Sequence, residues 1–334
     1  MTGAAMRAVR VFAFNDRSKV AVCDLPTPTP QPGEVLVEVK AAPVNYVDLV
    51  TMRGEYQFKP ELPYTPGKGP VGVVAAVGPD VDRVTIGDRV LAMAEYGGYA
   101  EYCLAPAAQT YRLPDEVGFF DAADMSLAYD TAWMALIDRA RLQAGDRVLV
   151  LGATGAVGRA AVQLARALGA GQVVVGVSSA DRFPELRRLG ADDYVEVAGD
   201  RLRDTIRDRV LEVTGGHGAD VVVDMLGGDV FDGAVRAVAW RGRLVVVGFA
   251  TGRIPTLKMN YPLLKNIEIS GLQISDYRKR LPERLDECFT NVFELAKRGA
   301  LTFQPAEAFP LDEWHRGLEA LESRSARGRV LLVP

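Results

Sequence analysis

The sequence has few cysteines and histidines, the residues that form disulfides and most transition-metal sites. Only 3 of its 334 residues are cysteine and only 2 are histidine. Cys23, Cys103 and Cys288 are an odd, scattered set, which predicts a reducing compartment and no disulfide framework. No other cysteine lies near Cys103, and His217 and His315 are far apart, so we expect no structural zinc site.

A surplus of basic residues and a long apolar run are also missing. The formal net charge is −4, and no basic run provides the positive surface that nucleic acids or anionic membranes require. No apolar stretch approaches the length of a membrane span, and the first residues lack the pattern of a signal peptide. We therefore expect a cytoplasmic protein with no nucleic-acid partner and no membrane partner.

The chain does contain enough apolar residues for two domains. Its length exceeds that of one ordinary domain, and 49% apolar residues can form two substantial cores. Residues 6–125 alternate short β-branched runs with proline and glycine clusters, which predicts a compact β-rich unit. Its expected strands include residues 20–22, 35–39, 71–77 and 89–93.

From about residue 126 to 266, the pattern changes to strands that alternate with helices. Apolar runs at 148–151, 173–177, 194–197, 221–224, 244–247 and 267–269 predict the strands. This alternation is typical of an α/β fold with a doubly wound parallel (Rossmann) sheet. Beyond residue 271, we expect helices around 283–298 and 311–321, and a terminal strand at 330–333 that returns to the first domain.

The most informative segment is a glycine-rich turn between the strand 148–151 and a helix over 158–168. Glycines at its three positions permit a tight turn, close approach of a phosphate and close packing of helix against strand. The helix start offers free N–H groups and a positive dipole to an anion. The turn therefore predicts a dinucleotide pyrophosphate site formed by Gly152, Ala153, Thr154, Gly155, Ala156, Val157 and Gly158.

The end of the next strand indicates which nicotinamide cofactor binds. An acidic residue at this position would hold the free ribose diol of NADH. Here the strand is followed by Ser178 and Ser179, with Arg182 close behind. Hydroxyl groups and a guanidinium suit the 2′-phosphate of NADPH, so we predict that these three residues bind NADPH. Two alternatives stay open: Arg182 is a solvated residue at a helix start, or Asp181 permits NADH.

A β-rich unit, an inserted dinucleotide fold and a C-terminal return together resemble the medium-chain dehydrogenase/reductase superfamily. Within it, motifs at residues 45–48, 53–60, 62–67, 98–102 and 247–255 are similar to those of the zinc-free quinone oxidoreductase branch. The resemblance covers nearly the whole chain. It implies a GroES-like β-rich catalytic domain of residues 1–125 plus 272–334 and a Rossmann domain of residues 126–271.

The resemblance also permits a test for catalytic zinc. Zinc-containing members of the superfamily carry a Gly-His-Glu segment, which here is Gly67-Lys68-Gly69, and the position of an upstream cysteine ligand is Asn45. These residues leave no catalytic zinc site, so we expect a zinc-independent enzyme. We expect Lys68 to be a solvated surface lysine. Gly69 departs from the acidic residue common in zinc-free relatives, which puts the local loop structure in question.

Without zinc, conjugate reduction is easier than reduction of a simple ketone, because the developing enolate needs only hydrogen-bond donors. Tyr56 matches the tyrosine that similar enoyl reductases use as a proton donor. The alternative is a tyrosine that lines the pocket or packs on the loop, and Tyr46 is a second candidate donor. We expect Asn45 to hydrogen-bond cofactor or substrate and Asp48 to brace the loop.

Further cofactor contacts follow from the same resemblance. Thr131 matches a position that approaches the nicotinamide, with a helix-facing threonine as the alternative. Gly248, Phe249 and Ala250 follow a sheet strand, where ligands of open α/β sheets bind, and should border the nicotinamide. Val197 stands where the family often has a phosphate-contacting tyrosine, which weakens the NADPH assignment slightly.

We therefore predict an NADPH-dependent reductase of quinones or activated double bonds, whose substrate is a small quinone, enone or enoyl compound. Two alternatives remain: an enoyl-thioester reductase, and a pseudoenzyme that binds NADPH as a redox sensor. The resemblance also implies a homodimer, joined through the edge strand near residues 267–269.

Overall fold

The computed structural model describes residues 5–323, 326 and 328–334. They divide into two compact units. The first unit comprises the described residues among Met1–Leu127, Arg278–Phe293 and Phe303–Pro334. The second comprises Ala128–Tyr277 and Glu294–Thr302.

The second unit contains a six-stranded parallel sheet in the order β10-β9-β8-β11-β12-β13. Apolar runs form its central strands because both faces are covered, and β8 and β9 are almost entirely buried. The predicted doubly wound parallel sheet is confirmed. Its strands are β8 (Arg147–Leu151), β9 (Gln172–Val177), β10 (Asp193–Glu196), β11 (Ala219–Asp224), β12 (Val238–Val246) and β13 (Glu268–Gly271).

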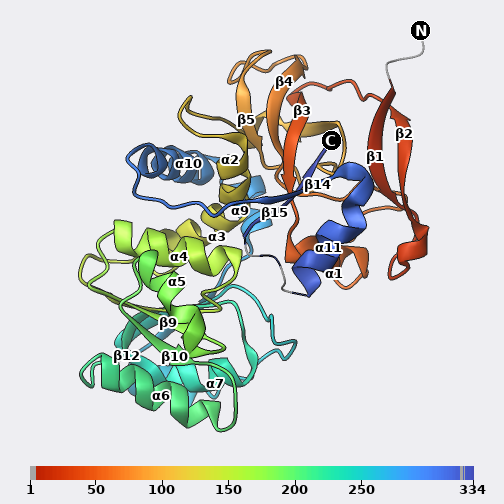
Figure 1. Ribbon diagram of the computed structural model, residues 1–334. Coiled ribbons are helices and arrows are strands. Elements are labelled where there is room, and N and C mark those ends of the chain that lie inside the picture. Colours follow the sequence, from red (N-terminus) through yellow and green to blue (C-terminus); the bar gives the residue numbers. More distant parts are fainter. Residues whose placement is uncertain (1–4, 324–325, 327) are drawn as a thin grey trace. The chain divides into compact units, whose positions relative to one another are not determined.

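Helices cover both faces of this sheet. Figure 1 shows α4 and α5 on one side of β9 and β10, and α6 and α7 on the other. The helices are α3 (Ala128–Trp133), continued by the π-helical η3 (Met134–Arg139), α4 (Ala156–Ala167), α5 (Phe183–Arg188), α6 (Leu202–Val213), α7 (Gly228–Ala237), α8 (Asn260–Lys265) and α9 (Ile274–Arg280). A 3₁₀ turn, η4 (Ala180–Arg182), precedes α5.

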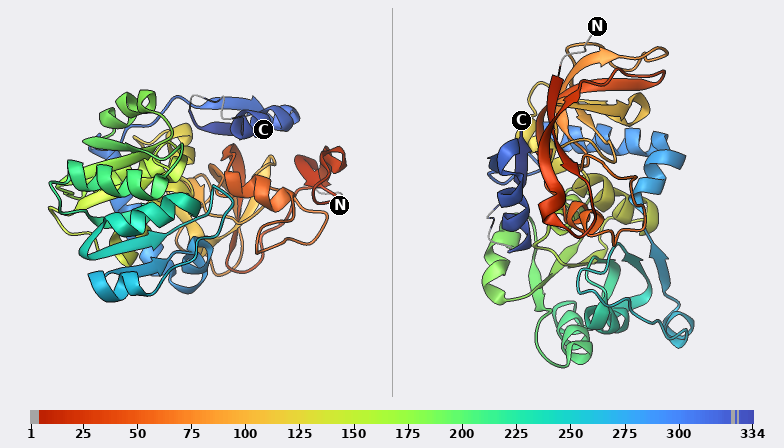
Figure 2. Two further views of the ribbon diagram at one scale, coloured as in Figure 1. Left: turned by 90° about the horizontal axis from the view of Figure 1, so that it is seen from below. Right: turned by 90° about the vertical axis from the view of Figure 1, so that its right-hand side faces the viewer.

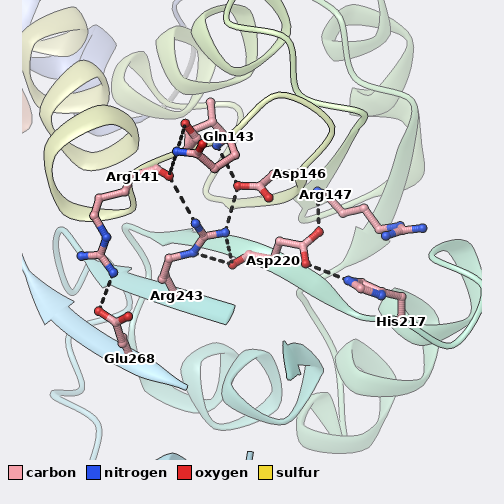
Figure 3. A network of polar contacts seen from close by, with 9 residues as sticks. Arg141, Gln143, Asp146, Arg147, His217, Asp220, Arg243 and Glu268 are labelled. Atoms are coloured by element: carbon pink, nitrogen blue, oxygen red, sulfur yellow. Dashed lines mark hydrogen bonds and ion pairs between the residues drawn. The ribbon is translucent and has the colours of Figure 1, made fainter. Parts of the chain in front are cut away.

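A polar network ties together the beginnings of the central strands (Figure 3). The Arg243 guanidinium donates a 2.9 Å hydrogen bond to Asp146 and also contacts the Asp220 carbonyl oxygen. The Asp220 carboxylate accepts a 2.8 Å bond from the Arg147 backbone and is hydrogen-bonded to His217 at 2.7 Å. His217 thus hydrogen-bonds a residue at the amino ends of the strands, on the side of the sheet away from their carboxyl ends.

The first unit is built from β-strands. A seven-stranded sheet has the order β14-β15-β3-β4-β5-β7, with β6 paired to β3, and β1 and β2 form a separate pair. The strands are β1 (Ala5–Val11), β2 (Val20–Pro26), β3 (Glu34–Pro43), β4 (Val71–Val77), β5 (Arg89–Ala92), β6 (Tyr102–Pro106), β7 (Thr110–Arg112), β14 (Glu307–Pro310) and β15 (Val330–Val333). The predicted β-rich unit is therefore confirmed.

The predicted return of the C-terminal strand is also confirmed. β15 pairs antiparallel with β3, where Leu332 lies opposite Ala42. Figure 2 shows α11 beside β14 and β15 in dark blue. The helices of this part are α1 (Tyr46–Met52), α2 (Phe119–Met125), α10 (Pro282–Lys297) and α11 (Trp314–Glu322), with 3₁₀ turns η1 (Arg17–Lys19), η2 (Ala107–Gln109) and η5 (Leu311–Glu313).

The segment that contains α11 also holds the end of α1. The Glu322 carboxylate accepts a 2.7 Å hydrogen bond from Arg53, the residue after α1, and a second bond from Arg17. Residues of α1, α11, β3 and β15 share one apolar core, which includes Leu49, Leu318 and Leu332. Among the described helices, none has the length and hydropathy of a membrane span.

Candidate functional site

The glycine turn joins β8 to α4 with the geometry that a bound phosphate requires. Gly152 has a left-handed φ of +82°, and a Cβ atom on Gly158 would lie 2.3 Å from the Gly152 carbonyl oxygen. A Cβ atom on Gly155 would meet only that oxygen, at 3.5 Å, so the space above this residue is open. The first N–H groups of any helix lack partners within it, and Gly155 has no side chain to cap them. The turn can accept a pyrophosphate.

The segment after β12 lies beside the segment after β11 at the carboxyl edge of the sheet. The backbone N–H of Gly248 donates to the Asp224 carbonyl at 3.3 Å, and that of Ala250 to Met225 at 3.1 Å. The Phe249 side chain is 41% exposed. Since β8, β11 and β12 are neighbours, the structure brings these predicted cofactor contacts and the glycine turn to one edge.

Asp224, which the sequence did not single out, braces this edge. Its Oδ1 accepts hydrogen bonds from the backbone of Leu226 at 2.8 Å and Gly227 at 3.0 Å. The buried Oδ2 has no hydrogen-bond partner among the described residues, and burial raises the pKa of this carboxyl. A Cβ atom on Gly152 would lie 3.2 Å from Leu226, so Asp224 supports a turn that packs on the glycine turn. An acidic residue at a strand's carboxyl end was the available signal.

Ser178, Ser179 and Arg182 are exposed residues just after β9, the neighbour of β8. Ser179 donates to Asp181, and the Arg182 guanidinium lies 3.8 Å from Glu185. These residues lie at the end of β9, where the contact with the 2′-phosphate was predicted, but the carboxylates of Asp181 and Glu185 lie close to them. The Val197 side chain packs toward Gly176, where it offers no hydrogen-bond donor.

Thr131 is buried in α3, which packs against α4. Its backbone N–H donates to the Asp130 carboxylate at 2.6 Å, and its hydroxyl donates to the same oxygen at 3.3 Å. Its contact with a nicotinamide stays a prediction.

In the first unit, Asn45 is the N-cap of α1 and its amide is bonded within the protein. The Oδ1 atom accepts a 2.6 Å hydrogen bond from the guanidinium of Arg329, the residue before β15. The Nδ2 atom donates to the Pro43 carbonyl at 3.1 Å and lies 3.5 Å from that of Lys68. The structure therefore shows Asn45 fixed by its own chain, and its contact with cofactor or substrate stays a prediction.

Asp48 braces the start of α1, as predicted. One oxygen of its buried carboxylate accepts hydrogen bonds from the Asn45 backbone and from the Tyr99 hydroxyl, both at 3.0 Å. Burial raises the pKa of Asp48 from 3.8 to about 6, although the positive charge of Lys68 and these hydrogen bonds oppose the rise.

The prediction that Lys68 is solvated is wrong. Its side chain is only 2% exposed, and its Nζ lies 2.6 Å from one oxygen of Glu95, whose other oxygen is 3.3 Å from Arg278. The ammonium also lies 4.6 Å from the centroid of the Tyr96 ring and 5.4 Å from that of Tyr56. A buried ammonium is unfavourable without a partner. Its partners come from distant parts of the chain, which the sequence does not reveal.

The structure answers the question raised by Gly69. This residue has a φ of +63°, and a Cβ atom on it would lie 2.0 Å from Ser126 Oγ. The Ser126 hydroxyl donates to the Gly69 carbonyl at 2.8 Å. The loop therefore has no space at this position for an acidic side chain. No cluster of three or more potential metal-binding side chains of His, Cys, Asp or Glu occurs in the part of the chain that is described.

The two candidate proton donors differ in their surroundings. Tyr56 is half-buried after α1, where its ring contacts Phe58 edge-on with centroids 6.0 Å apart. Tyr46, at the start of α1, is 58% exposed. Lys68, paired with Glu95, lies 5.4 Å from the centroid of the Tyr56 ring.

Comparisons with known proteins identify the family. Residues 31–115 match the alcohol dehydrogenase GroES-like domain, and residues 156–290 match the zinc-binding dehydrogenase family. A quinone oxidoreductase-like protein 2 homologue of Nematostella vectensis is 36% identical over 301 residues, which cover 90% of this chain and 81% of that protein. The chain belongs to the quinone oxidoreductase-like branch of the medium-chain dehydrogenase/reductase superfamily.

Solved structures of this superfamily share the fold over almost the whole chain. A mycobacterial protein complexed with NADPH has a TM-score of 0.89 at 31% identity, covering 98% of this chain and 100% of that one. Quinone oxidoreductase of Escherichia coli complexed with NADPH has a TM-score of 0.88 at 26% identity, with the same coverage. The oxidoreductase fold, a GroES-like domain with a Rossmann sheet, is thus established.

Proposed function

We propose that the protein is a zinc-independent, NADPH-dependent reductase of quinones or activated double bonds. One observation carries the proposal: the residues at the zinc-ligand positions of the superfamily are committed to other partners. Asn45 is bonded through its amide to Arg329, and Lys68 is paired with Glu95. The acceptor must then be activated by hydrogen-bond donors, which are sufficient to stabilise the negative charge that develops on a conjugated acceptor.

The second unit provides groups that fit NADPH. We assign the pyrophosphate to the glycine turn and the 2′-phosphate to Ser178, Ser179 and Arg182, which are exposed beside it. Thr131 and the segment Gly248-Phe249-Ala250 would border the nicotinamide, which supplies a hydride when bound. The NADPH complexes of two relatives with this fold support the assignment.

In the first unit, Tyr56 would hold the proton that the acceptor receives. Asn45 and Asp48 hold the start of α1 in place, and we propose that Asn45 also hydrogen-bonds the cofactor or the substrate. We propose that residues 1–125 plus 272–334 form the catalytic domain and that residues 126–271 form the dinucleotide-binding domain.

We also propose that the protein is a cytoplasmic homodimer. The strand β13 lies at one edge of the parallel sheet. Met259, Leu263 and Leu264 near it are each more than 70% exposed, so a second copy has both an open strand edge and apolar surface to bind. The three cysteines are free thiols, which fits a reducing compartment.

The proposal is tested by oxidation of NADPH and NADH by chelator-treated protein with quinones, enones and enoyl thioesters. We expect turnover with one acceptor class and NADPH. The Tyr56→Phe variant should lose about 10²-fold or more in kcat, as expected for loss of a general acid, and should retain NADPH affinity. Tyr46→Phe is the matched control and should behave like the wild type.

Three outcomes would contradict parts of this proposal. Unchanged turnover of Tyr56→Phe would remove that residue as the proton donor. Activity lost to the chelator and restored by zinc would overturn zinc independence. NADPH binding without oxidation by any acceptor would favour the redox-sensor alternative.

A further inference from the structure

The buried ion pair of Lys68 is difficult to explain by stability alone. The side chains of Lys68 and Arg278 are 2% and 1% exposed, and both contact the same carboxylate of Glu95. Desolvation of such charges offsets most of their attraction, and well-packed apolar residues are often at least as stabilising. A fixed positive charge at this position therefore calls for a functional reason.

The surroundings of the ammonium indicate that reason. Lys68 Nζ lies against the rings of Tyr56 and Tyr96 while Glu95 holds it at 2.6 Å. The Tyr96 hydroxyl donates a 3.0 Å hydrogen bond to the Phe58 carbonyl, so this ring is tied to the segment that carries Tyr56. The cation is thus fixed beside the tyrosine that we assign as the proton donor.

We propose that Lys68 is a positioning residue for Tyr56, and that its fixed charge takes over part of the electrostatic role of the metal in zinc-containing relatives. This inference rests on the proposed function. In the reaction, the acceptor gains a hydride from the cofactor and a proton from Tyr56 Oη, and water then returns a proton to the phenolate. A cation on the ring favours the negative charge that develops on the phenol oxygen as the proton leaves.

The burial of Lys68 determines which kinetic constant it affects. An ammonium that is 2% exposed and bonded to Glu95 has almost no surface to offer to a substrate. Its influence reaches the reaction through the Tyr56 ring and is strongest when charge develops in the transition state. Removal of the charge should therefore lower kcat and leave the KM of both substrates nearly unchanged.

The experiment compares Lys68→Met, Lys68→Gln and Lys68→Arg with the wild type, alone and with Tyr56→Phe. We expect the two neutral variants to lose about tenfold in kcat, the size of a desolvated cation–π interaction expressed as a rate. Lys68→Arg should retain most of the activity. Combined with Tyr56→Phe, Lys68→Met should cause no further loss, because both changes remove one shared effect.

Lys279 provides the matched control. Its ammonium lies 5.2 Å from the centroid of the Phe58 ring, a similar contact made by an exposed lysine. Lys279→Met should leave kcat unchanged, and the melting temperature of each variant verifies that it is folded. If Lys68→Gln reproduces the effect of Lys68→Met, the charge and not the packing is responsible.

The outcomes separate this inference from the proposed function. Turnover by the wild type together with additive losses in the double variant, or with a rise in KM alone, overturns the role of Lys68 and leaves the reductase assignment in place. If the wild type reduces none of the acceptors, the proposed function fails and this inference fails with it.

Discussion

Replacement of Asp48 by asparagine should make the protein more stable at neutral pH, although it removes a buried charge that is hydrogen-bonded. Asparagine has nearly the same shape, and its carbonyl oxygen can accept the hydrogen bonds from the Asn45 backbone and the Tyr99 hydroxyl. The variant therefore removes the ionisation and keeps the brace at the start of α1.

The magnitude follows from the pKa of Asp48, which rises from 3.8 to about 6 on folding, chiefly through burial. The folded protein binds the proton of Asp48 more tightly than the unfolded chain does. Protonation of Asp48 therefore contributes to the free energy of unfolding in full below pH 3.8, and this contribution is lost as pH rises through 6. The total is about 3 kcal/mol, of which about 2 kcal/mol is lost between pH 4.5 and 7.5. Asp48 interacts electrostatically with several charged or titratable groups around it: Lys68, Tyr64, Tyr96, Tyr99 and Arg329.

The assay is the melting temperature of the wild type and of Asp48→Asn at pH 4.5 and 7.5. The advantage of the variant should grow by about 3 °C between these pH values if the chain unfolds in one transition. Asp88→Asn is a control of opposite sign. Burial tends to raise the pKa of Asp88, but hydrogen bonds from Thr85 and Arg112 hold it below its usual value, so its loss should destabilise. A pH-independent difference for Asp48→Asn would refute the reasoning.

Two further predictions concern the second unit. Gly158→Ala should raise the KM for NADPH at least about tenfold, because its Cβ atom would lie 2.3 Å from the Gly152 carbonyl oxygen and the turn must shift. Gly118→Ala, whose nearest contact is 3.6 Å and which lies outside the predicted cofactor site, is the control, and equal effects of the two would contradict the explanation. If β13 joins two copies, light scattering should give twice the chain mass of 36.1 kDa, and a monomer at micromolar concentration would exclude this dimer.

The second unit could be predicted from the sequence because its determinants are local. The apolar run of β8, the glycines after it and the periodicity of α4 all lie between Arg147 and Ala167, so the strand, turn and helix can be predicted without knowledge of the rest. The parallel sheet then follows from the alternation of such units. Even there, Asp224 was missed, because its role depends on a turn that packs against Gly152.

The surroundings of the candidate catalytic residues could not be predicted in the same way. Lys68 can be buried because Glu95, 27 residues away, neutralises its charge. Glu95 is in turn bound by Arg278, which lies a further 183 residues along the chain. The hydrogen bond from Arg329 to Asn45 joins residues that are 284 positions apart in the sequence. The requirement for glycine at position 69 arises from Ser126. The resemblance to the family selected these positions as candidates for the site, but the residues that contact them could be identified only from the folded structure.

The two contacts that hold α1 have a consequence for how the chain reaches its native state during synthesis. Asn45 before this helix and Arg53 after it are bound by Arg329 and Glu322, which follow 284 and 269 residues later. At about 5–20 residues per second, a ribosome needs roughly 15–60 s to cover that interval. During this time the nascent chain lacks both anchors of α1, whereas β8, the glycine turn and α4 are translated well before the anchors appear. The structure around α1 is therefore completed only after its two C-terminal anchors have been translated.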